Sequence, residues 1–580
     1  MIQNNQPFDY IIIGAGSAGC VLANRLSKNP SNRVLLLEYG GHNKSLLIDM
    51  PSALSYPMNM PKYNWGFYSE KEPHLNNRRM NTPRGKGLGG SSAVNGMVYV
   101  RGHANDFNQW QQLGAKNWGY AHCLPYFCYA EHWFAQEDIY RGKQGPLYVK
   151  QGDNLNKNPL YQAFIQAGNQ AGYSYTEDYN AYQQEGFSPM QMTIKNGVRC
   201  STYQAYLKPA LKRKNLTVIT KSLVNKVLIK DKTAIGVECI YNKKVIQYFC
   251  KKEIILSAGP INSPAILQRS SIGDQATLSK AKVALIHELP GVGKNLQDHL
   301  EVYFQYQCKQ PITLNSKLSK LHKLLIGTQW LFLKKGLGTS NHFEACAFIR
   351  SKSGLIAPDI QYHFLPAAIR YDGKQAFKGD GFQVHVGPNK PKSRGSVTIT
   401  SSNAKVAPNI QFNYLKEDQD IIDWRACIHL TSEILLQPAM DPYRGTVIQP
   451  DIDLSSDQSI DQWVRENAES AYHPCGTCKM GDVDDALAVV DSACKVIGIN
   501  KLRVVDSSIF PVITNGNLNA PTIMVAEKAS DLILGTKPLD EINAKVWRPP
   551  NWQLTQRPNK PIRASAFAFN KAKTTKHLIA

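Results

Sequence analysis

A short segment around residue 475 holds side chains suited to chemistry: His473-Pro-Cys475-Gly-Thr-Cys478-Lys-Met-Gly481. Two cysteines separated by two residues have the spacing of a thiol redox pair or of half a zinc site. The histidine before them could instead act as a catalytic base, because its ordinary pKa lies near working pH. The segment alone leaves these alternatives open, so the elements that position it must decide between them.

The other cysteines do not support a metal or disulfide framework. The chain has 12 cysteines in 580 residues, and they are scattered, as at Cys20, Cys123 and Cys239. No second ligand pair stands at zinc spacing, so we expect no metal site. The sequence has no charged-then-apolar leader and no apolar run approaching ~18–20 residues. We therefore expect a cytoplasmic protein, with peripheral contact to the inner face of the cell membrane as an option.

Length and composition indicate a globular protein of two or more domains. Hydrophobic residues make up 43% of the chain and charged residues 19%, which excludes a disordered chain. The 67 Lys+Arg against 45 Asp+Glu give a net charge of +22. That surplus could suit nucleic acid, but no basic stripe interleaved with aromatics is present. A basic surface that keeps the protein in solution, or draws it to an anionic membrane, fits better.

The first residues predict a strand, a glycine turn and a helix. The apolar run 8–13 is typical of a strand buried in a parallel sheet, and 33–38 predicts a second strand that ends in an acid. The glycine turn between them fits a pyrophosphate held on the amides at a helix N-terminus. The acid can accept hydrogen bonds from ribose hydroxyls, which disfavours NADP but does not separate NAD from FAD. The candidate residues are Gly14, Gly16, Ser17, Ala18, Gly19 and Glu38.

A second glycine-rich loop over residues 83–96 favours FAD over NAD as the cofactor. Five glycines and two serines within twelve residues make a backbone that can lie against a flat or charged ligand. A dehydrogenase that uses NAD needs no second loop of this kind, whereas a protein that binds a flavin does. The candidate residues are Gly87, Gly90, Ser91, Asn95 and Gly96.

These motifs resemble the glucose–methanol–choline (GMC) family of FAD-dependent oxidoreductases. The family's first signature matches from Gly85 to Asn108, and its second matches residues 259–273, except that Ser271 stands where glycine is usual. Further matches lie at 290–299, 503–507 and 517–522. The resemblance therefore covers the chain from the first strand to about residue 535.

The resemblance implies an α/β fold, α+β overall, with a Rossmann-like FAD-binding domain and a substrate-binding domain. The first would comprise residues 1–155, 195–310 and 460–535. The second would comprise residues 156–194 and 311–459, with an antiparallel sheet covered by helices on its far side. Residues 536–580 form a basic tail, which is either a solvated end or a segment that docks on anionic lipid near membrane quinones. Its basic residues from 540 onwards are Lys545, Arg548, Arg557, Lys560, Arg563, Lys571, Lys573 and Lys576.

The resemblance also implies roles for single residues. His473 would take the proton of an alcohol, and Asn519 would hydrogen-bond the substrate oxygen; Cys475 and Cys478 would be bystanders. Val94 stands where some relatives carry a histidine bonded to the flavin, so we expect noncovalent FAD. The strand-like region around Val224 would meet adenine, and Asp506 and Ser507 would lie near the ribityl chain and pyrophosphate.

Further motifs resemble the choline-oxidising subgroup, the bacterial choline dehydrogenases, among them Asn341-His342-Phe-Glu344 and Asp441-Pro-Tyr-Arg-Gly445. That likeness implies oxidation of choline to betaine aldehyde for glycine betaine synthesis, with electrons passed to a respiratory acceptor such as a quinone. Glu344 would face the fixed positive charge, and Tyr472, with His342 as a weaker candidate, would wall the pocket. The alternatives are a dehydrogenase or oxidase acting on another primary alcohol, or a lyase that binds FAD without redox chemistry.

Overall fold

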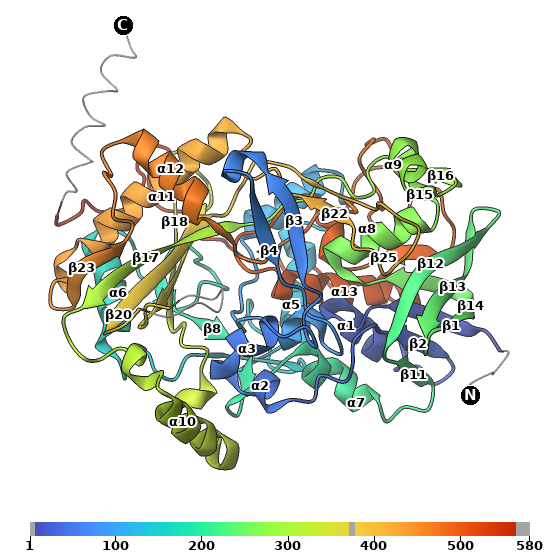
Figure 1. The fold of residues 1–580 in the computed structure, drawn as a ribbon, viewed down its shortest axis with the longest axis horizontal. Coiled ribbons are helices and arrows are strands. Elements are labelled where there is room, and N and C mark those ends of the chain that lie inside the picture. Colours follow the sequence, from blue (N-terminus) through green and yellow to red (C-terminus); the bar gives the residue numbers. More distant parts are fainter. Residues whose placement is uncertain (1–5, 370–376, 564–580) are drawn as a thin grey trace, which may run out of the picture.

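The computed structural model describes residues 6–369 and 377–563 and contains two large sheets (Figure 1). The first is seven-stranded, in the order β11-β2-β1-β14-β13-β12 with β25 beside β14. Its strands are β1 (Phe8–Ile13), β2 (Val34–Leu37), β11 (Leu216–Ile219), β12 (Ser222–Lys230), β13 (Thr233–Tyr241), β14 (Lys244–Leu256) and β25 (Leu502–Val504). The pairs around β1 and β2, and the pair of β14 with β25, are parallel, whereas β12, β13 and β14 form an antiparallel meander.

The second sheet is also seven-stranded, in the order β23-β17-β20-β19-β18-β7 with β24 beside β17. Its strands are β7 (Gly186–Pro189), β17 (Leu300–Cys308), β18 (Ala345–Ile349), β19 (Ile360–Leu365), β20 (Gly381–Pro388), β23 (Arg444–Gln449) and β24 (Glu469–Ser470). Every pair in it is antiparallel. The helices α6 (Pro159–Gln170) and α11 (Asp418–Leu435) contact its strands, and α12 (Asp457–Asn467) packs on α11 (Figure 1).

The predicted fold class is confirmed: a Rossmann-like sheet stands beside an antiparallel sheet backed by helices. The first sheet draws strands from three separated stretches of the chain. Two strands differ from the predicted boundaries, because β17 and β24 belong to the second sheet although residues 195–310 and 460–535 were assigned to the FAD-binding part. The other boundaries stay a prediction.

The turn from β1 into α1 (Ser17–Leu26) depends on close backbone contacts. Gly14 has φ +98°, a left-handed conformation that favours glycine. A Cβ at Gly19 would lie 1.9 Å from the carbonyl oxygen of Gly14, so the helix could not pack this close to the turn with any larger residue. Later in the chain, Ser271 adopts φ +69°, which is consistent with the glycine usual at that family position.

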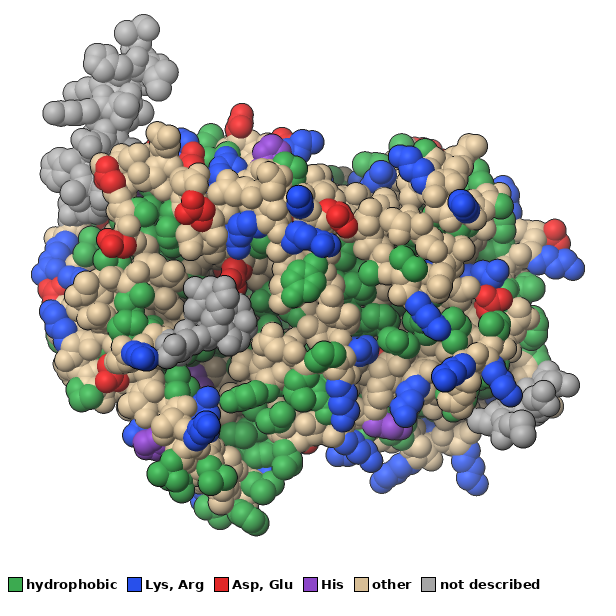
Figure 2. All heavy atoms as spheres, in the orientation of Figure 1, with side chains coloured by type: hydrophobic (Ala, Val, Ile, Leu, Met, Phe, Trp, Pro, Cys, Tyr) green, Lys and Arg blue, Asp and Glu red, His purple; other side chains and the backbone are tan. Residues whose placement is uncertain are grey.

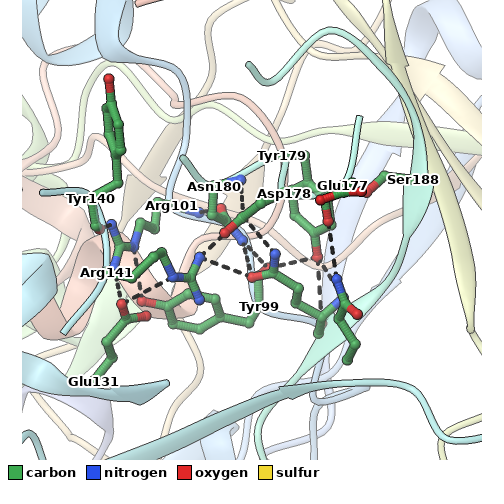
Figure 3. A network of polar contacts seen from close by, with 12 residues as sticks. Tyr99, Arg101, Glu131, Tyr140, Arg141, Glu177, Asp178, Tyr179, Asn180 and Ser188 are labelled. Atoms are coloured by element: carbon green, nitrogen blue, oxygen red, sulfur yellow. Dashed lines mark hydrogen bonds and ion pairs between the residues drawn. The ribbon is translucent and has the colours of Figure 1, made fainter. Parts of the chain in front are cut away.

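A buried ionic network ties the segment that follows the second glycine loop to the rest of the chain (Figure 3). The guanidinium of Arg101 pairs with Glu131, and Arg141 lies 3.2 Å from the same carboxylate and 3.3 Å from Asp178. Asn180 accepts a hydrogen bond from the backbone amide of Arg101 at 2.7 Å. Loss of one partner would leave a buried charge without compensation, so the network holds these segments in one arrangement.

The segment after the last FAD-domain helix, α13 (Asn519–Leu534), is fastened to the body up to residue 563. The Arg557 guanidinium lies 2.9 Å from Glu433, and Arg563 lies 2.9 Å from Asp441. Acids from α11 and from the loop after it therefore hold these two arginines of the basic tail, so the segment up to residue 563 is not a free solvated end. Lys571, Lys573 and Lys576 lie outside the described residues.

Candidate active site

A long cavity runs from the N-terminus of α1 to one face of the second sheet. Of the residues predicted for the cofactor, those that line it are Gly14, Gly16, Ser17, Ala18, Glu38, Gly90, Ser91, Asn95, Gly96, Val224, Asp506 and Ser507. His473, Asn519 and Tyr472 line it as well. The glycine loops and the proposed base therefore share one cavity although they lie hundreds of residues apart in the sequence.

Two predicted cofactor residues, Gly19 and Gly87, are not among the lining residues. Gly19 permits the packing of α1 described above. The amide of Gly87 donates to Glu38 Oε1 at 3.0 Å, and the amide of Ala15 donates to Glu38 Oε2 at 2.9 Å. Gly87 thus supports the cavity from behind, by fixing the carboxylate that forms part of its wall.

The nucleotide end of the cavity fits a dinucleotide such as FAD. A Cβ at Gly16 would meet no protein atom nearer than 3.9 Å, and one at Gly96 would meet none within 4 Å. Both glycines therefore leave a cradle that a side chain would fill. Amides at the start of α1 face this cradle, and they can hold the charge of a pyrophosphate.

Asp506 is held rigidly at the same wall. Its carboxylate accepts hydrogen bonds from the Gly259 amide at 2.9 Å, the Ser263 hydroxyl at 2.6 Å and the Ser508 amide at 2.8 Å. Burial raises the pKa of the Asp506 carboxyl, although these donors oppose the rise. The fixed orientation suits a residue that positions a ligand hydroxyl or the neighbouring backbone.

His473 lies at the opposite end of the cavity and is fixed at three points. Its amide donates to Asp298 Oδ1 at 2.7 Å. Its Nδ1 lies 3.1 Å from His299 Nδ1, and its Nε2 lies 2.9 Å from Asn517 Nδ2. Burial, followed by the charges of His299, His363 and Arg84, holds the pKa of His473 well below its ordinary value. The imidazole is therefore neutral at working pH and can accept a proton.

The hydrogen bonds around His299 decide which nitrogen of His473 carries the proton. His299 Nε2 lies 3.1 Å from the carbonyl oxygen of Asn389, which can only accept, so this nitrogen carries hydrogen. Burial lowers the pKa of His299 to about 3, so its Nδ1 is an acceptor. His473 Nδ1 must then donate to it, which leaves the lone pair on His473 Nε2, where it accepts from Asn517 Nδ2 at 2.9 Å.

Asn517, and not Asn519, is the amide beside the base. Asn517 Oδ1 accepts from Gln361 Nε2 at 3.3 Å, which turns its Nδ2 toward His473 Nε2. The side-chain oxygen of Asn519 instead accepts from the Ser17 hydroxyl at 2.7 Å, at the N-terminus of α1. The prediction that Asn519 shares the substrate oxygen with His473 is therefore wrong in this structure: Asn519 begins α13 and faces the cofactor end of the cavity.

One face of the second sheet forms the wall opposite the base. Because side chains alternate along a strand, Tyr303, His363 and His385 line the cavity while their neighbours pack into the core. The register pairs Tyr303 with His385 and His385 with His363 across β17, β20 and β19. The rings of Tyr303 and His385 lie 4.3 Å apart, and that of Phe343 lies 5.2 Å from His385. The result is an aromatic wall.

Glu301 places a carboxylate in that wall. Its Oε1 lies 3.3 Å from His385 Nδ1 and accepts from the Tyr303 hydroxyl at 3.2 Å. Burial alone would raise the pKa of Glu301, but His385, His363 and Tyr303 outweigh it and hold the pKa below its ordinary value. The carboxylate is therefore charged at neutral pH.

Glu344 does not face the cavity. Its side chain is 0% exposed and accepts hydrogen bonds from the Asn154 amide at 2.9 Å and side chain at 2.8 Å, and from the Ser340 hydroxyl. Its neighbour Phe343 lines the cavity, so Glu344, one residue on, points elsewhere. The prediction that Glu344 faces a substrate charge is wrong in this structure. His342, the weaker candidate, is not among the lining residues either.

Tyr472, which was predicted to wall the substrate pocket, lines the cavity and has φ +65° just before His473. Its carbonyl oxygen accepts from Arg84 Nη2 at 2.6 Å. Arg84 is itself a lining residue, and nothing in its local sequence singled it out. It therefore braces the backbone next to the base.

The cysteine pair lies in an environment that disfavours the thiolate form. Cys475 and Cys478 are both fully buried and free, and burial raises the pKa of each thiol above its ordinary value. Protonated thiols are poor nucleophiles and poor ligands. Within residues 6–369 and 377–563, no group of three or more His, Cys, Asp or Glu side chains could hold a metal ion.

The motifs did not identify the residues of the aromatic wall, but the alternation of polar and apolar residues along their strands could have. Polar side chains alternate with Val302 and Phe304 in Glu301-Val-Tyr303-Phe, and His385 stands between Val384 and Val386. Alternation predicts a common face for each strand. It does not predict the register between strands, which brings these faces together.

Comparison with protein families agrees with the geometry. A family model described as GMC oxidoreductase matches residues 8–301, and a second model with the same description matches 391–526. This chain is a GMC oxidoreductase. Like the family, it is an FAD-dependent alcohol oxidoreductase, and residues of both glycine loops line the same cavity as His473.

Curated relatives of this GMC oxidoreductase match almost its whole length. It is 59% identical over 553 residues to an oxygen-dependent choline dehydrogenase of Photobacterium profundum, covering 95% of this chain and 97% of the relative. It is 60% identical over 558 residues to an oxygen-dependent choline dehydrogenase of Vibrio vulnificus, covering 96% and 100%.

Solved structures share the fold. Pyridoxine 4-oxidase from Mesorbium loti has a TM-score of 0.83 at 30% identity, over 91% of this chain and 100% of that one. A formate oxidase of Aspergillus oryzae RIB40 has a TM-score of 0.85 at 26% identity, over 91% and 98%. In the described part of this GMC oxidoreductase, no helix is both long and apolar enough to cross a bilayer.

Proposed function

We propose that this GMC oxidoreductase oxidises choline to betaine aldehyde, a step of glycine betaine synthesis. The observation that carries the proposal is the placement of Glu301 and an aromatic wall in the same cavity as the His473–Asn517 pair. The names of the curated relatives support the same substrate.

The cation end of the site matches a quaternary ammonium group. Such a group carries a fixed positive charge and donates no hydrogen bonds, so it is bound by aromatic faces and a carboxylate. Tyr303, Phe343 and Tyr472 supply the faces, and Glu301 supplies the charge. A substrate held there presents its other end to His473.

The proton of the substrate hydroxyl passes to His473 Nε2, whose lone pair faces the cavity. In this structure Asn517 Nδ2 donates to that nitrogen at 2.9 Å, and with substrate bound it would donate instead to the substrate oxygen as negative charge develops there. One such donor typically lowers the activation barrier by ~3–4 kcal/mol. His299 does not touch the substrate; it positions His473 by accepting from Nδ1–H.

FAD, when bound, supplies the hydride acceptor, the flavin N5. Gly16, Glu38, Asn95 and Asp506 are among the residues that would hold it. Val94 lines the cavity where a covalent link would form and offers no nucleophile, so the flavin is held noncovalently. Acid precipitation should release FAD into the supernatant.

The electrons then pass to a respiratory acceptor such as a quinone, with the enzyme in peripheral contact with the membrane. The printed name of the curated relatives includes oxygen, which makes direct oxidation by oxygen the competing outcome. Stoichiometric peroxide production in air would identify an oxidase. Faster turnover with a soluble quinone than with oxygen would support the respiratory acceptor.

Anaerobic mixing of the yellow holoenzyme with choline, ethanol or butanol tests the substrate. Choline should bleach the flavin absorbance at concentrations where the plain alcohols do not. Bleaching by plain alcohols alone would assign a different primary alcohol. If none of them bleaches the bound FAD, the remaining alternative is a lyase that binds FAD without redox chemistry.

A further inference from the structure

Helix α10 (Lys320–Leu333) turns a row of apolar side chains to solvent. Leu321 is 66% exposed, and Phe332 is 76% exposed. Together with exposed Leu325 they recur at intervals of four and seven residues, so they share one face of the helix. Figure 2 shows this face as a green projection at the lower edge of the molecule. A contiguous exposed apolar surface indicates an interaction site.

The opposite face of α10 is anchored to the body. Trp330 is 2% exposed, and its indole nitrogen donates to the carbonyl oxygen of Gly197 at 2.7 Å. Gly338, just after the helix, packs so closely that a Cβ there would lie 2.6 Å from Trp330 and 3.0 Å from Met50. The exposed row therefore belongs to a helix with a fixed orientation.

The surroundings of the row are strongly basic. Residues 302–343 contain six lysines and no aspartate or glutamate. Lys317, Lys320, Lys323 and Lys335 lie on α10 or at its ends, and all four are exposed. An apolar row flanked by cations is the pattern of a helix that lies in a membrane interface. At 14 residues, α10 is also too short to span a bilayer, which needs ~20.

We infer that α10 docks this protein on an anionic membrane surface. Leu321, Leu325 and Phe332 enter the boundary between headgroups and acyl chains, and the flanking lysines contact lipid phosphates. A second copy of the chain fits this face less well. Pairing two such faces about a twofold axis would bring the lysines together with no carboxylate on α10 to neutralise them.

The docked face lies next to the active-site cavity. The turn η6 (Gly336–Thr339), which follows α10, packs on η1 (Pro51–Ala53), and α3 (Ser55–Met58) lies close by in Figure 1. Leu54 and Met58 line the cavity. Docking would thus bring one cavity wall near the lipid, where a lipophilic electron acceptor resides. This last link rests on the proposed function, and the docking of α10 assigns a specific surface to the peripheral membrane contact proposed there.

Co-sedimentation of the holoenzyme with vesicles tests the inference without any substrate. The vesicles would be phosphatidylcholine alone, or phosphatidylcholine with ~30% phosphatidylglycerol, a fraction that gives the surface a clear negative charge. Wild type should bind the anionic vesicles, and less so in ~1 M salt, where the Debye length falls to ~3 Å. The double variant Leu321→Glu/Phe332→Glu should bind at least roughly tenfold more weakly.

Matched variants separate α10 from other surfaces. Leu554→Glu changes another highly exposed leucine and should leave binding unchanged. The triple variant Lys571→Glu/Lys573→Glu/Lys576→Glu tests the chain end in the same way and should also leave vesicle binding unchanged. Each variant should keep its flavin absorbance and its rate of flavin reduction by choline. Loss of docking can therefore be distinguished from failure of the proposed function.

Three outcomes would overturn the inference. Wild type would fail to bind anionic vesicles, or the α10 double variant would bind as wild type does. Alternatively, wild type would form dimers that the double variant abolishes, while neither protein binds vesicles.

Discussion

The Nδ1 atoms of His299 and His473 lie 3.1 Å apart, and only one of them can carry a proton in that contact. Because the Asn389 carbonyl holds the hydrogen of His299 on Nε2, the shared proton belongs to His473. A buried histidine that is not among the cavity-lining residues thus sets the nitrogen on which His473 can accept a proton.

Replacing His299 should therefore impair chemistry more than folding. His299→Phe removes the acceptor for His473 Nδ1–H, and the rate of anaerobic flavin reduction should fall by at least roughly tenfold. His299→Gln keeps a side-chain oxygen that can accept, so it should retain more of the rate. The pH profile of kcat/KM should also shift in the Phe variant. A Phe variant with normal rate and profile would show that His299 only fills space.

Matched asparagine variants test which amide serves the reaction. Asn517→Ala should slow flavin reduction by roughly 10²–10³-fold with FAD retained, because a donor to the developing oxyanion is lost. Asn519→Ala should chiefly weaken FAD retention, because its side chain contacts Ser17 at the start of α1. Stopped-flow reduction and flavin content per chain measure the two effects. The reverse pattern would restore Asn519 as the partner of the base.

The pH dependence follows from the lowered pKa of His473. Only the neutral imidazole accepts a proton, so activity is lost as pH falls through that pKa. Burial and the neighbouring His299, His363 and Arg84 place this pKa below 6.5. The acid limb of kcat/KM for choline should accordingly have its midpoint below about pH 6.5. An acid limb with its midpoint at or above pH 6.5 that is absent from the profile of His473→Ala would contradict the lowered pKa of His473.

The cysteine pair should be dispensable. With both thiols buried and protonated, Cys475→Ser/Cys478→Ser should reduce its flavin at close to the wild-type rate. Thermal unfolding should occur at lower temperature, because each buried hydroxyl without a partner costs roughly 1–3 kcal/mol. Loss of flavin reduction in a variant that still holds FAD would return the pair to a redox role.

Local sequence predicted the parts of the site that depend on local structure. The turn from Gly14 to Gly19 and the loop around Gly90 sit beside their own strand and helix, so spacing alone indicates their role. Asn517 and Asn519 differ in direction because α13 begins at Asn519, and a helix boundary is known from sequence only to within a few residues.

Identifying the acid that faces the cavity required information that the local sequence does not carry. Glu301 and Glu344 both lie at or next to the start of a strand of the second sheet, and either could face a cavity. Alternation along the chain sends Phe343 to the cavity and Glu344 away from it, while Glu301 reaches the cavity beside His385. That choice is made by strand register and by the contacts of Asn154, which belong to distant parts of the chain.

The most direct test of the account compares choline with its uncharged isostere, 3,3-dimethylbutan-1-ol, in anaerobic flavin reduction by wild type and Glu301→Gln. Wild type should prefer choline. Glu301→Gln should lower the second-order rate constant for choline at least roughly tenfold and leave that for the isostere nearly unchanged, because only choline loses a charge partner. Glu344→Gln is the matched control, with any loss falling on both substrates alike. Equal losses for the two substrates in Glu301→Gln, or a choline-specific loss in Glu344→Gln, would contradict the assignment.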